Sequence, residues 1–156
     1  MCGICGFNWK DEKTIKEMNK TLIHRGPDFQ GYYTDQNLSL GHVRLSILDL
    51  SEKGNQPMGL KDNEYVIVYN GEVYNFRELK MDLINKGYKF KSETDTEVVL
   101  NLYKECGCES FKKLNGIFAF VIYDKKKNEI ILCRDFLGIK PYIFIIKTTN
   151  LFFLVK

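Results

Sequence analysis

The chain has 156 residues, of which 44% are hydrophobic and 28% charged, and its formal net charge is +3. This length and composition fit one domain with its own core, and they exclude a disordered tail and a two-domain enzyme. The charge is too small for a nucleic-acid scaffold, and the basic run at residues 125–127 predicts a solvated hairpin tip. No stretch approaches the ~20 apolar residues of a membrane span, and no signal-peptide pattern opens the chain. We therefore expect a cytoplasmic protein with no nucleic-acid or membrane partner.

The first half of the chain predicts both strands and a helix. A short apolar stretch with two glycines at residues 2–7 predicts a buried strand. Residues 11–23 have helical periodicity, and Thr14 and Glu17 have the spacing of a capping box. Further strands are predicted at 31–34, 38–47 and 65–69, and a polar segment over 49–58 predicts a loop.

The second half predicts two more helices, followed by two hairpins. One helix begins near Phe76 and ends before Gly87, and the next covers residues 94–106 with Thr94 and Glu97 at capping-box spacing. The predicted hairpins pair 117–123 with 129–133 and 142–146 with 151–155. Since strands and helices are mixed without strict alternation, we predict an α+β fold in which helices cover the faces of antiparallel sheets.

The five cysteines do not form a disulfide framework, because their number is odd and their density low. Their spacing also disfavours zinc, since Cys106 and Cys108 are separated by a single residue. Cys2 and Cys5 lack the preceding strand that a redox pair needs. We therefore expect no metal site, and we expect Cys106 to be a small core residue.

The sharpest chemical feature is the cysteine at position 2. If Met1 is removed, Cys2 carries a thiol and a free α-amine, and an α-amine with a pKa near 8 can act as the base for its own thiol. Such a residue needs no histidine, and the chain has only His24 and His42, for which packing roles are expected. The alternative is that a cysteine at this position is there by chance.

Three other features permit either a structural or a functional interpretation. Asn70 and Gly71 follow an apolar strand and would supply two adjacent donors for an oxyanion, although Asn-Gly is also a common turn. Arg44 lies in an otherwise apolar strand, where a cation needs an internal acid or a ligand carboxylate as its partner. Asp95 begins a predicted helix, where an acid also simply complements the helix dipole.

Ordered motifs along the chain resemble a known family. They are Met1-Cys2-Gly3-Ile4-Cys5-Gly6, His24-Arg25-Gly26-Pro27-Asp28 and the segments at residues 41–51, 54–58, 69–75, 94–98, 114–120 and 134–141. The first motif resembles the start of class II (N-terminal-nucleophile) glutamine amidotransferases. Together, over residues 1–141, the motifs resemble the glutaminase domain of glutamine-hydrolysing asparagine synthetases, so residues 1–156 are interpreted as one such domain.

This resemblance implies a four-layer αββα sandwich of antiparallel sheets and a role for each matched residue. Cys2 would attack the glutamine amide and form a thioester, while Asn70 and Gly71 would form the oxyanion hole. Arg44 would bind the substrate carboxylate, and Glu72 with Asp95 would bind its ammonium group. The backbone of Leu45, Ser46, Ile47 and Leu48 would line the pocket. Residues 25–28 and 134–141 would brace loops.

The resemblance does not extend to a synthetase. No Ser-Gly-Gly sequence or Walker-type loop for ATP is present, so ATP and magnesium are expected only in a synthetase domain outside this chain. The family also continues beyond the last predicted strand, so the domain is expected to be truncated at its C-terminus. We expect this to expose apolar residues of the last hairpin, with Phe152, Phe153, Leu154 and Val155 most affected and residues 144–146 beside them, which would favour a homo-oligomer.

Two interpretations of function remain. The first is a glutaminase that hydrolyses glutamine through a Cys2 thioester and passes ammonia to an amide-forming synthetase domain or chain. The second is an inactive remnant, or a non-catalytic interaction module, with the same fold. The unsubstituted catalytic positions favour the first interpretation, and the early end of the chain favours the second.

Overall fold

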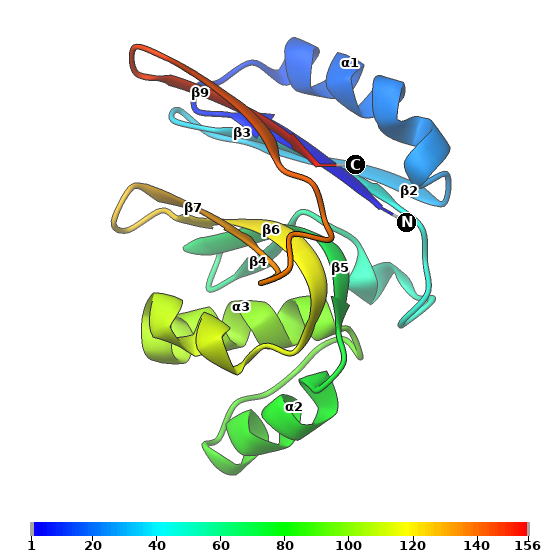
Figure 1. The fold of residues 1–156 in the computed structure, drawn as a ribbon, viewed down its shortest axis with the longest axis vertical. Coiled ribbons are helices and arrows are strands. Elements are labelled where there is room, and N and C mark those ends of the chain that lie inside the picture. The colour runs from blue at the N-terminus through cyan, green and yellow to red at the C-terminus, as the bar shows by residue number, and fades with distance from the viewer. Residues whose placement is uncertain (1, 156) are drawn as a thin grey trace.

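The computed structural model describes residues 2–155, in which two antiparallel sheets face each other between layers of helix (Figure 1). Helix α1 (Glu12–Leu22) lies on the outer face of the first sheet, and α3 (Asp95–Cys106) lies on the outer face of the second. Helix α2 (Phe76–Asn85) packs against α3. This arrangement confirms the predicted α+β class and the four-layer αββα sandwich. The removal of Met1 cannot be followed here, because Met1 lies outside the described residues.

The first sheet has the strand order β2-β3-β1-β9-β8, and every pair in it is antiparallel. Its strands are β1 (Gly3–Phe7), β2 (Phe29–Thr34), β3 (Ser39–Arg44), β8 (Ile143–Lys147) and β9 (Asn150–Val155). The central strand β1 is buried along its whole length, because α1 covers one face and the second sheet covers the other. Cys2, which directly precedes β1, is therefore held at the middle of the sandwich.

The second sheet has the order β4-β5-β6-β7 and is also antiparallel throughout. Its strands are β4 (Met58–Leu60), β5 (Tyr65–Val73), β6 (Gly116–Asp124) and β7 (Glu129–Arg134). The described residues 2–155 also include three 3₁₀ segments: η1 (Ile23–Arg25), η2 (Glu52–Gly54) and η3 (Gly107–Lys113). The lysine run at 125–127 forms the exposed turn between β6 and β7, as predicted.

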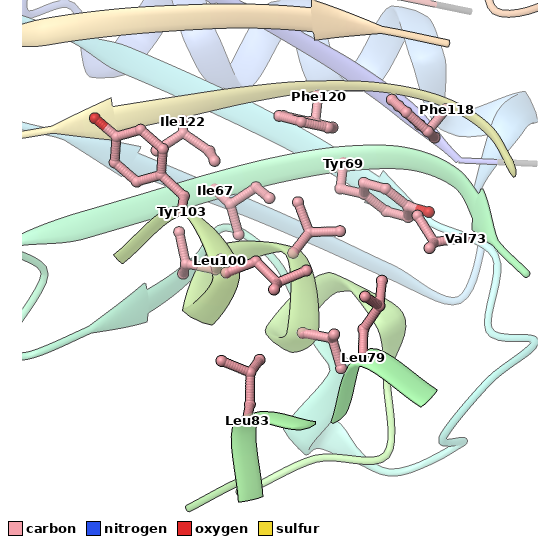
Figure 2. Packing of buried hydrophobic residues seen from close by; sticks show 13 residues of the cluster. Ile67, Tyr69, Val73, Leu79, Leu83, Leu100, Tyr103, Phe118, Phe120 and Ile122 are labelled. Carbon is pink, nitrogen blue, oxygen red and sulfur yellow. The ribbon is translucent and has the colours of Figure 1, made fainter. Parts of the chain in front are cut away.

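The side chains of the second sheet alternate between two cores, as expected for strands covered on both faces. Figure 2 shows Tyr69, Phe118 and Phe120 directed toward the helices, where Leu79 and Leu100 meet them. The alternate residues, such as Val68 and Val121, point to the first sheet and pack against β1 and β9. These two cores fix the position of β5, which carries Asn70 and Gly71.

Several element boundaries differ from the sequence predictions. Strand β5 continues to Val73, so Asn70 and Gly71 lie inside a strand and do not form a turn. Strand β3 ends at Arg44, three residues earlier than predicted. The cap of α1 is Asp11, whose carboxylate accepts the Thr14 N–H at 2.9 Å, so the predicted box of Thr14 and Glu17 is wrong. For α3 the capping prediction is confirmed, since Thr94 accepts the Glu97 N–H.

The last hairpin exposes only some of the predicted residues: Phe144, Ile145 and Ile146 are exposed as predicted, but Phe153 and Val155 are not. Phe153 and Val155 of β9 are fully buried between the sheets, because β1 and the second sheet cover them. The exposed residues are those of the edge strand β8, where Ile143, Phe144, Ile145 and Ile146 are 51–64% exposed.

No helix within residues 2–155 is long and apolar enough to span a membrane.

Candidate active site

A cavity of about 100 Å³ opens where the two sheets meet near the start of β1. This volume is several times what one water molecule needs. All the predicted site residues except Ser46 line it. The fold thus gathers them from the residue before β1, the end of β3 and the segment after it, β5 and the start of α3.

Cys2 lies half-buried at one wall of this cavity. Its sulfur accepts the Leu45 backbone N–H at 3.4 Å, and its thiol is 3.7 Å from the Leu45 carbonyl oxygen. Burial raises the pKa of the thiol, while the Leu45 N–H and the charge of Arg44 act in the opposite direction. The nearby protein groups therefore offset part of the desolvation that disfavours the thiolate.

Asn70 presents an unusual buried donor to the same cavity. Its side chain is 1% exposed, yet its Nδ2 has no hydrogen-bond partner among residues 2–155. Buried amide groups are almost always paired, and leaving one unpaired costs about 1–3 kcal/mol. An unpaired donor that lines a cavity with a thiol in its wall is what an oxyanion site requires before its substrate arrives.

The next residue must be glycine for steric reasons. A Cβ at Gly71 would lie 2.3 Å from the Ile117 carbonyl oxygen and 2.4 Å from the Phe118 Cα, both on the neighbouring strand β6. Strand β5 therefore lies unusually close to β6 beside Asn70. This close approach explains why the Asn-Gly pair continues the strand where sequence alone also allowed a turn.

Arg44 ends β3 and is 5% exposed. Its Nη1 donates to the Ser51 carbonyl at 2.8 Å and to Asn55 Oδ1 at 2.9 Å, and its Nη2 donates to the carbonyls of Leu48 (3.2 Å) and Asp49. These oxygens belong to the segment that forms the adjacent cavity wall. Arg44 thus holds this wall in place and brings a positive charge to the cavity.

Two carboxylates, those of Glu72 and Asp95, also line the cavity. Asp95 is 4% exposed and its Oδ2 accepts the Tyr69 hydroxyl at 2.6 Å and the Val73 N–H at 2.9 Å. Burial raises the pKa of Asp95, these hydrogen bonds lower it, and the nearby Glu72 carboxylate adds to the rise. A cation bound between Glu72 and Asp95 would relieve this repulsion.

Ser46 lies outside the cavity, although its neighbours Leu45, Ile47 and Leu48 line it. The Ser46 N–H donates to Asp28 Oδ2 at 2.7 Å. Asp28, in the motif expected to brace loops, thus holds the backbone segment that carries Leu45 against Cys2.

Sequence reasoning missed several polar residues of the cavity, among them Gln56, Tyr69 and Lys140. Gln56 accepts the Tyr69 N–H at 2.7 Å and donates to the Thr96 hydroxyl at 3.2 Å, so it ties β5 to α3. Tyr69 supplies the hydroxyl bound by Asp95. Lys140 lines the cavity and is only 2% exposed. Its motif at residues 134–141 was visible in the sequence, but its burial was not.

The remaining cysteines and histidines lie elsewhere. Cys5 is buried, which raises the pKa of its thiol to about 12, and Cys106 is exposed, so its predicted core role is wrong. His42 is buried in the sandwich, as predicted, with Nε2 3.2 Å from the Tyr69 carbonyl oxygen. Within residues 2–155 no group of three or more His, Cys, Asp or Glu side chains is arranged to hold a metal.

Comparison with known proteins agrees with this arrangement. Residues 1–155 match the model of a glutamine amidotransferase domain. The chain is 45% identical to a putative glutamine-hydrolysing asparagine synthetase 2 of Methanocaldococcus jannaschii, over 92% of this chain and 32% of that protein. It is 43% identical to a glutamine-hydrolysing asparagine synthetase 1 of Bacillus subtilis, over 92% of this chain and 24% of that one. The chain thus spans a third or less of the length of each of these curated relatives.

A solved structure shows the same fold. The glutamine phosphoribosylpyrophosphate amidotransferase of B. subtilis matches with a TM-score of 0.80 and 24% identity, over 98% of this chain and 41% of that one. The fold is therefore that of the N-terminal-nucleophile amidotransferases. The chain belongs to the class II glutamine amidotransferase domain family, and its relatives at 40–45% identity are the N-terminal domains of glutamine-hydrolysing asparagine synthetases.

Proposed function

We propose that this chain hydrolyses the side-chain amide of glutamine to glutamate and ammonia through a thioester on Cys2. The observation that carries this proposal is the buried, unpaired Nδ2 of Asn70 in the wall of the cavity that Cys2 also lines. A purely structural module would have no reason to keep an unsatisfied donor at that position.

In the proposed reaction the Cys2 sulfur attacks the amide carbon, and the thiol proton passes to the α-amine of Cys2 once Met1 has been removed. The oxyanion is stabilised by Asn70 Nδ2 and the Gly71 N–H. The protonated amine then gives its proton to the leaving nitrogen, and ammonia departs as the carbonyl re-forms. Water attacks the resulting thioester, which releases glutamate and restores the thiol.

The cavity also has the charges that a zwitterionic substrate needs. We assign the substrate carboxylate to the side of Arg44 and its ammonium to Glu72 and Asp95. The terminal N–H groups of Arg44 already bind loop oxygens, so Arg44 would act through its charge and through the wall it holds. Backbone groups of Leu45, Ile47 and Leu48 would contact the substrate between these charges.

We further propose that the ammonia serves a synthetase domain or chain of the kind named in the longer relatives. Their amide-forming step, with ATP and magnesium, would take place outside this chain, to which we assign no cofactor. A cytoplasmic location stays a prediction. The inactive interaction module is the alternative that the following experiment separates.

The test combines mass spectrometry of the N-terminus with ammonia release from glutamine. We expect a mature chain that begins at Cys2, activity that is lost in Cys2→Ala, and activity that is retained in the control Cys106→Ser, whose thiol is exposed and far along α3. A chain that retains Met1 should be nearly inactive, because its Cys2 nitrogen is an amide. Full ammonia release by a Met1-retaining chain would refute the mechanism, and no release by the processed wild type would favour the inactive module.

A further inference from the structure

The turn between β7 and β8 buries two charged side chains, Asp135 and Lys140, and exposes several apolar ones. Lys140 is 2% exposed, whereas Phe136 is 101%, Leu137 78% and Ile139 54% exposed. Burying a lysine is costly unless charged or polar groups compensate for it. The residues around Lys140 therefore indicate what its ammonium group does.

Asp135 builds this turn. Its carboxylate accepts the N–H groups of Ile139 (2.8 Å) and Lys140 (3.0 Å), and its own N–H donates to the Phe118 carbonyl on β6 at 2.8 Å. Gly138 adopts φ +66° and donates to the Asp135 carbonyl at 3.0 Å. The backbone of Lys140 is thus fixed to the sheet that carries the candidate active site.

The side chain of Lys140 reaches the candidate active site itself, since it lines the cavity with Cys2 and Glu72. Burial lowers the pKa of the Lys140 ammonium and the nearby Arg25 lowers it further, while Cys2, Asp135 and Glu72 raise it. Because Lys140 and Cys2 line the same cavity, an ammonium group on Lys140 would favour the ionised form of the Cys2 thiol through its charge.

We propose that Lys140 is a positioning residue that stabilises the thiolate form of Cys2, and that Asp135 holds it in place for this task. This inference deepens the proposed function, because it rests on Cys2 being the nucleophile. Other charged groups line the cavity with Cys2, namely Arg44 at the end of β3, Glu72 on β5 and Asp95 on α3, and Arg25 in η1 lies near Lys140. All of them, and the α-amine of Cys2, are the same in the variants compared below.

The test measures the reactivity of each thiol without any substrate. The wild type, Lys140→Met and Lys140→Arg are treated with iodoacetamide from pH 5.5 to 9.5, and mass spectrometry follows the alkylation of each cysteine. Exposed Cys106 and Cys108 serve as internal references, and buried Cys5 should stay unmodified for as long as the chain is folded. If Lys140→Met fails this protection test, Lys140→Gln replaces it.

We expect the pH midpoint of Cys2 alkylation to rise by about one unit in Lys140→Met, with Lys140→Arg close to the wild type and the references unmoved. Asp135→Asn should shift Cys2 in the same direction as Lys140→Met. An unchanged Cys2 midpoint in folded Lys140→Met would overturn the inference, as would equal shifts at Cys2 and Cys106.

Ammonia release separates this inference from the proposed function. A midpoint shift in a chain that does not hydrolyse glutamine would uphold the role of Lys140 and refute the glutaminase. Hydrolysis whose pH profile is identical in wild type and Lys140→Met, without a shift in alkylation, would uphold the glutaminase and refute the role of Lys140.

Discussion

The candidate active site and strand β8 depart from the usual distribution of side chains in opposite ways. Around the site Arg44, Asn70, Asp95 and Lys140 are buried, although such residues are mostly exposed in folded proteins. Strand β8 instead exposes a continuous apolar run. Buried polar groups that line a cavity indicate a bound ligand, whereas an exposed apolar strand indicates a surface for contact with another protein surface. The two regions therefore indicate different kinds of contact.

The contrast is sharpest at a pair of phenylalanines that face each other across β8 and β9. Phe144 and Phe153 are direct cross-strand partners, so their side chains lie on the same face of the sheet. Phe153 is fully buried by the second sheet, while Phe144 is 59% exposed. The second sheet therefore covers the inner strand of the hairpin and leaves the edge strand bare.

The largest expected effect follows from this pair. Phe153→Ala should lower the free energy of unfolding by about 3–5 kcal/mol, because it leaves a cavity between the sheets. Phe144→Ala, the matched control, should change it by less than about 0.5 kcal/mol. Denaturant unfolding measures both, and equal losses would mean that β8 is covered in solution.

The second prediction concerns the buried polar region. Asn70→Ala should reduce the kcat of glutamine hydrolysis by about 10²–10³-fold, as for the loss of an oxyanion donor, with a much smaller change in KM. Its unfolding free energy should not fall, because Nδ2 has no partner to lose among residues 2–155 and its removal relieves the cost of an unpaired buried donor. Steady-state kinetics and denaturant unfolding on the same sample check both. A variant that loses stability and keeps its kcat would place Asn70 among structural residues.

The third prediction uses His42, which is buried in the sandwich but does not line the cavity. Burial lowers the pKa of His42 from 6.5 to about 3. Between these values the unfolded chain binds a proton that the folded chain does not, so the free energy of unfolding falls as the pH falls, by about 1.4 kcal/mol per pH unit.

Comparison of the wild type with His42→Gln isolates this contribution, since the other titrating groups are common to both. Between pH 6.5 and 5 the wild type should lose about 2 kcal/mol more than the variant. Denaturant unfolding at these two pH values measures the difference. Parallel losses would show that His42 already binds its proton in the folded chain.

The smallest expected effect is on β8. Ile145→Lys should leave stability within about 0.5 kcal/mol of the wild type, because Ile145 is 61% exposed, and should reduce self-association. Gln36→Lys adds the same charge at an exposed site of the first sheet's far hairpin and serves as the control. Size-exclusion chromatography over a range of concentrations measures the effect. If Ile145→Lys and Gln36→Lys reduce self-association to the same extent, the added positive charge controls association and the apolar edge strand does not.

The α+β class follows from the apolar periodicity, which acts locally, whereas the four-layer arrangement was predicted from the family resemblance. The length of β5 does not follow, since Asn70 and Gly71 favour a turn locally and only the backbone of β6, too close for a Cβ, makes glycine a strand residue there. The burial of Phe153 likewise depends on a sheet formed by residues far away in the chain.

Most residues of the candidate site were predicted from the family resemblance, and in the structure these residues line one cavity. Lys140 was not predicted, because a lysine in a loop motif is ordinarily solvated. Its burial depends on the turn that Asp135 organises, which no local pattern reveals.

That same turn has a mechanical consequence. Its tip presents Phe136 and Leu137 to solvent, and two residues after Gly138 its backbone places Lys140 beside Cys2. A protein surface that contacted the tip would act on a short, hydrogen-bonded turn. The last residue of this turn's hydrogen-bonded part, Lys140, lines the cavity. Docking at the outside would therefore be transmitted to Cys2 over a single turn of chain.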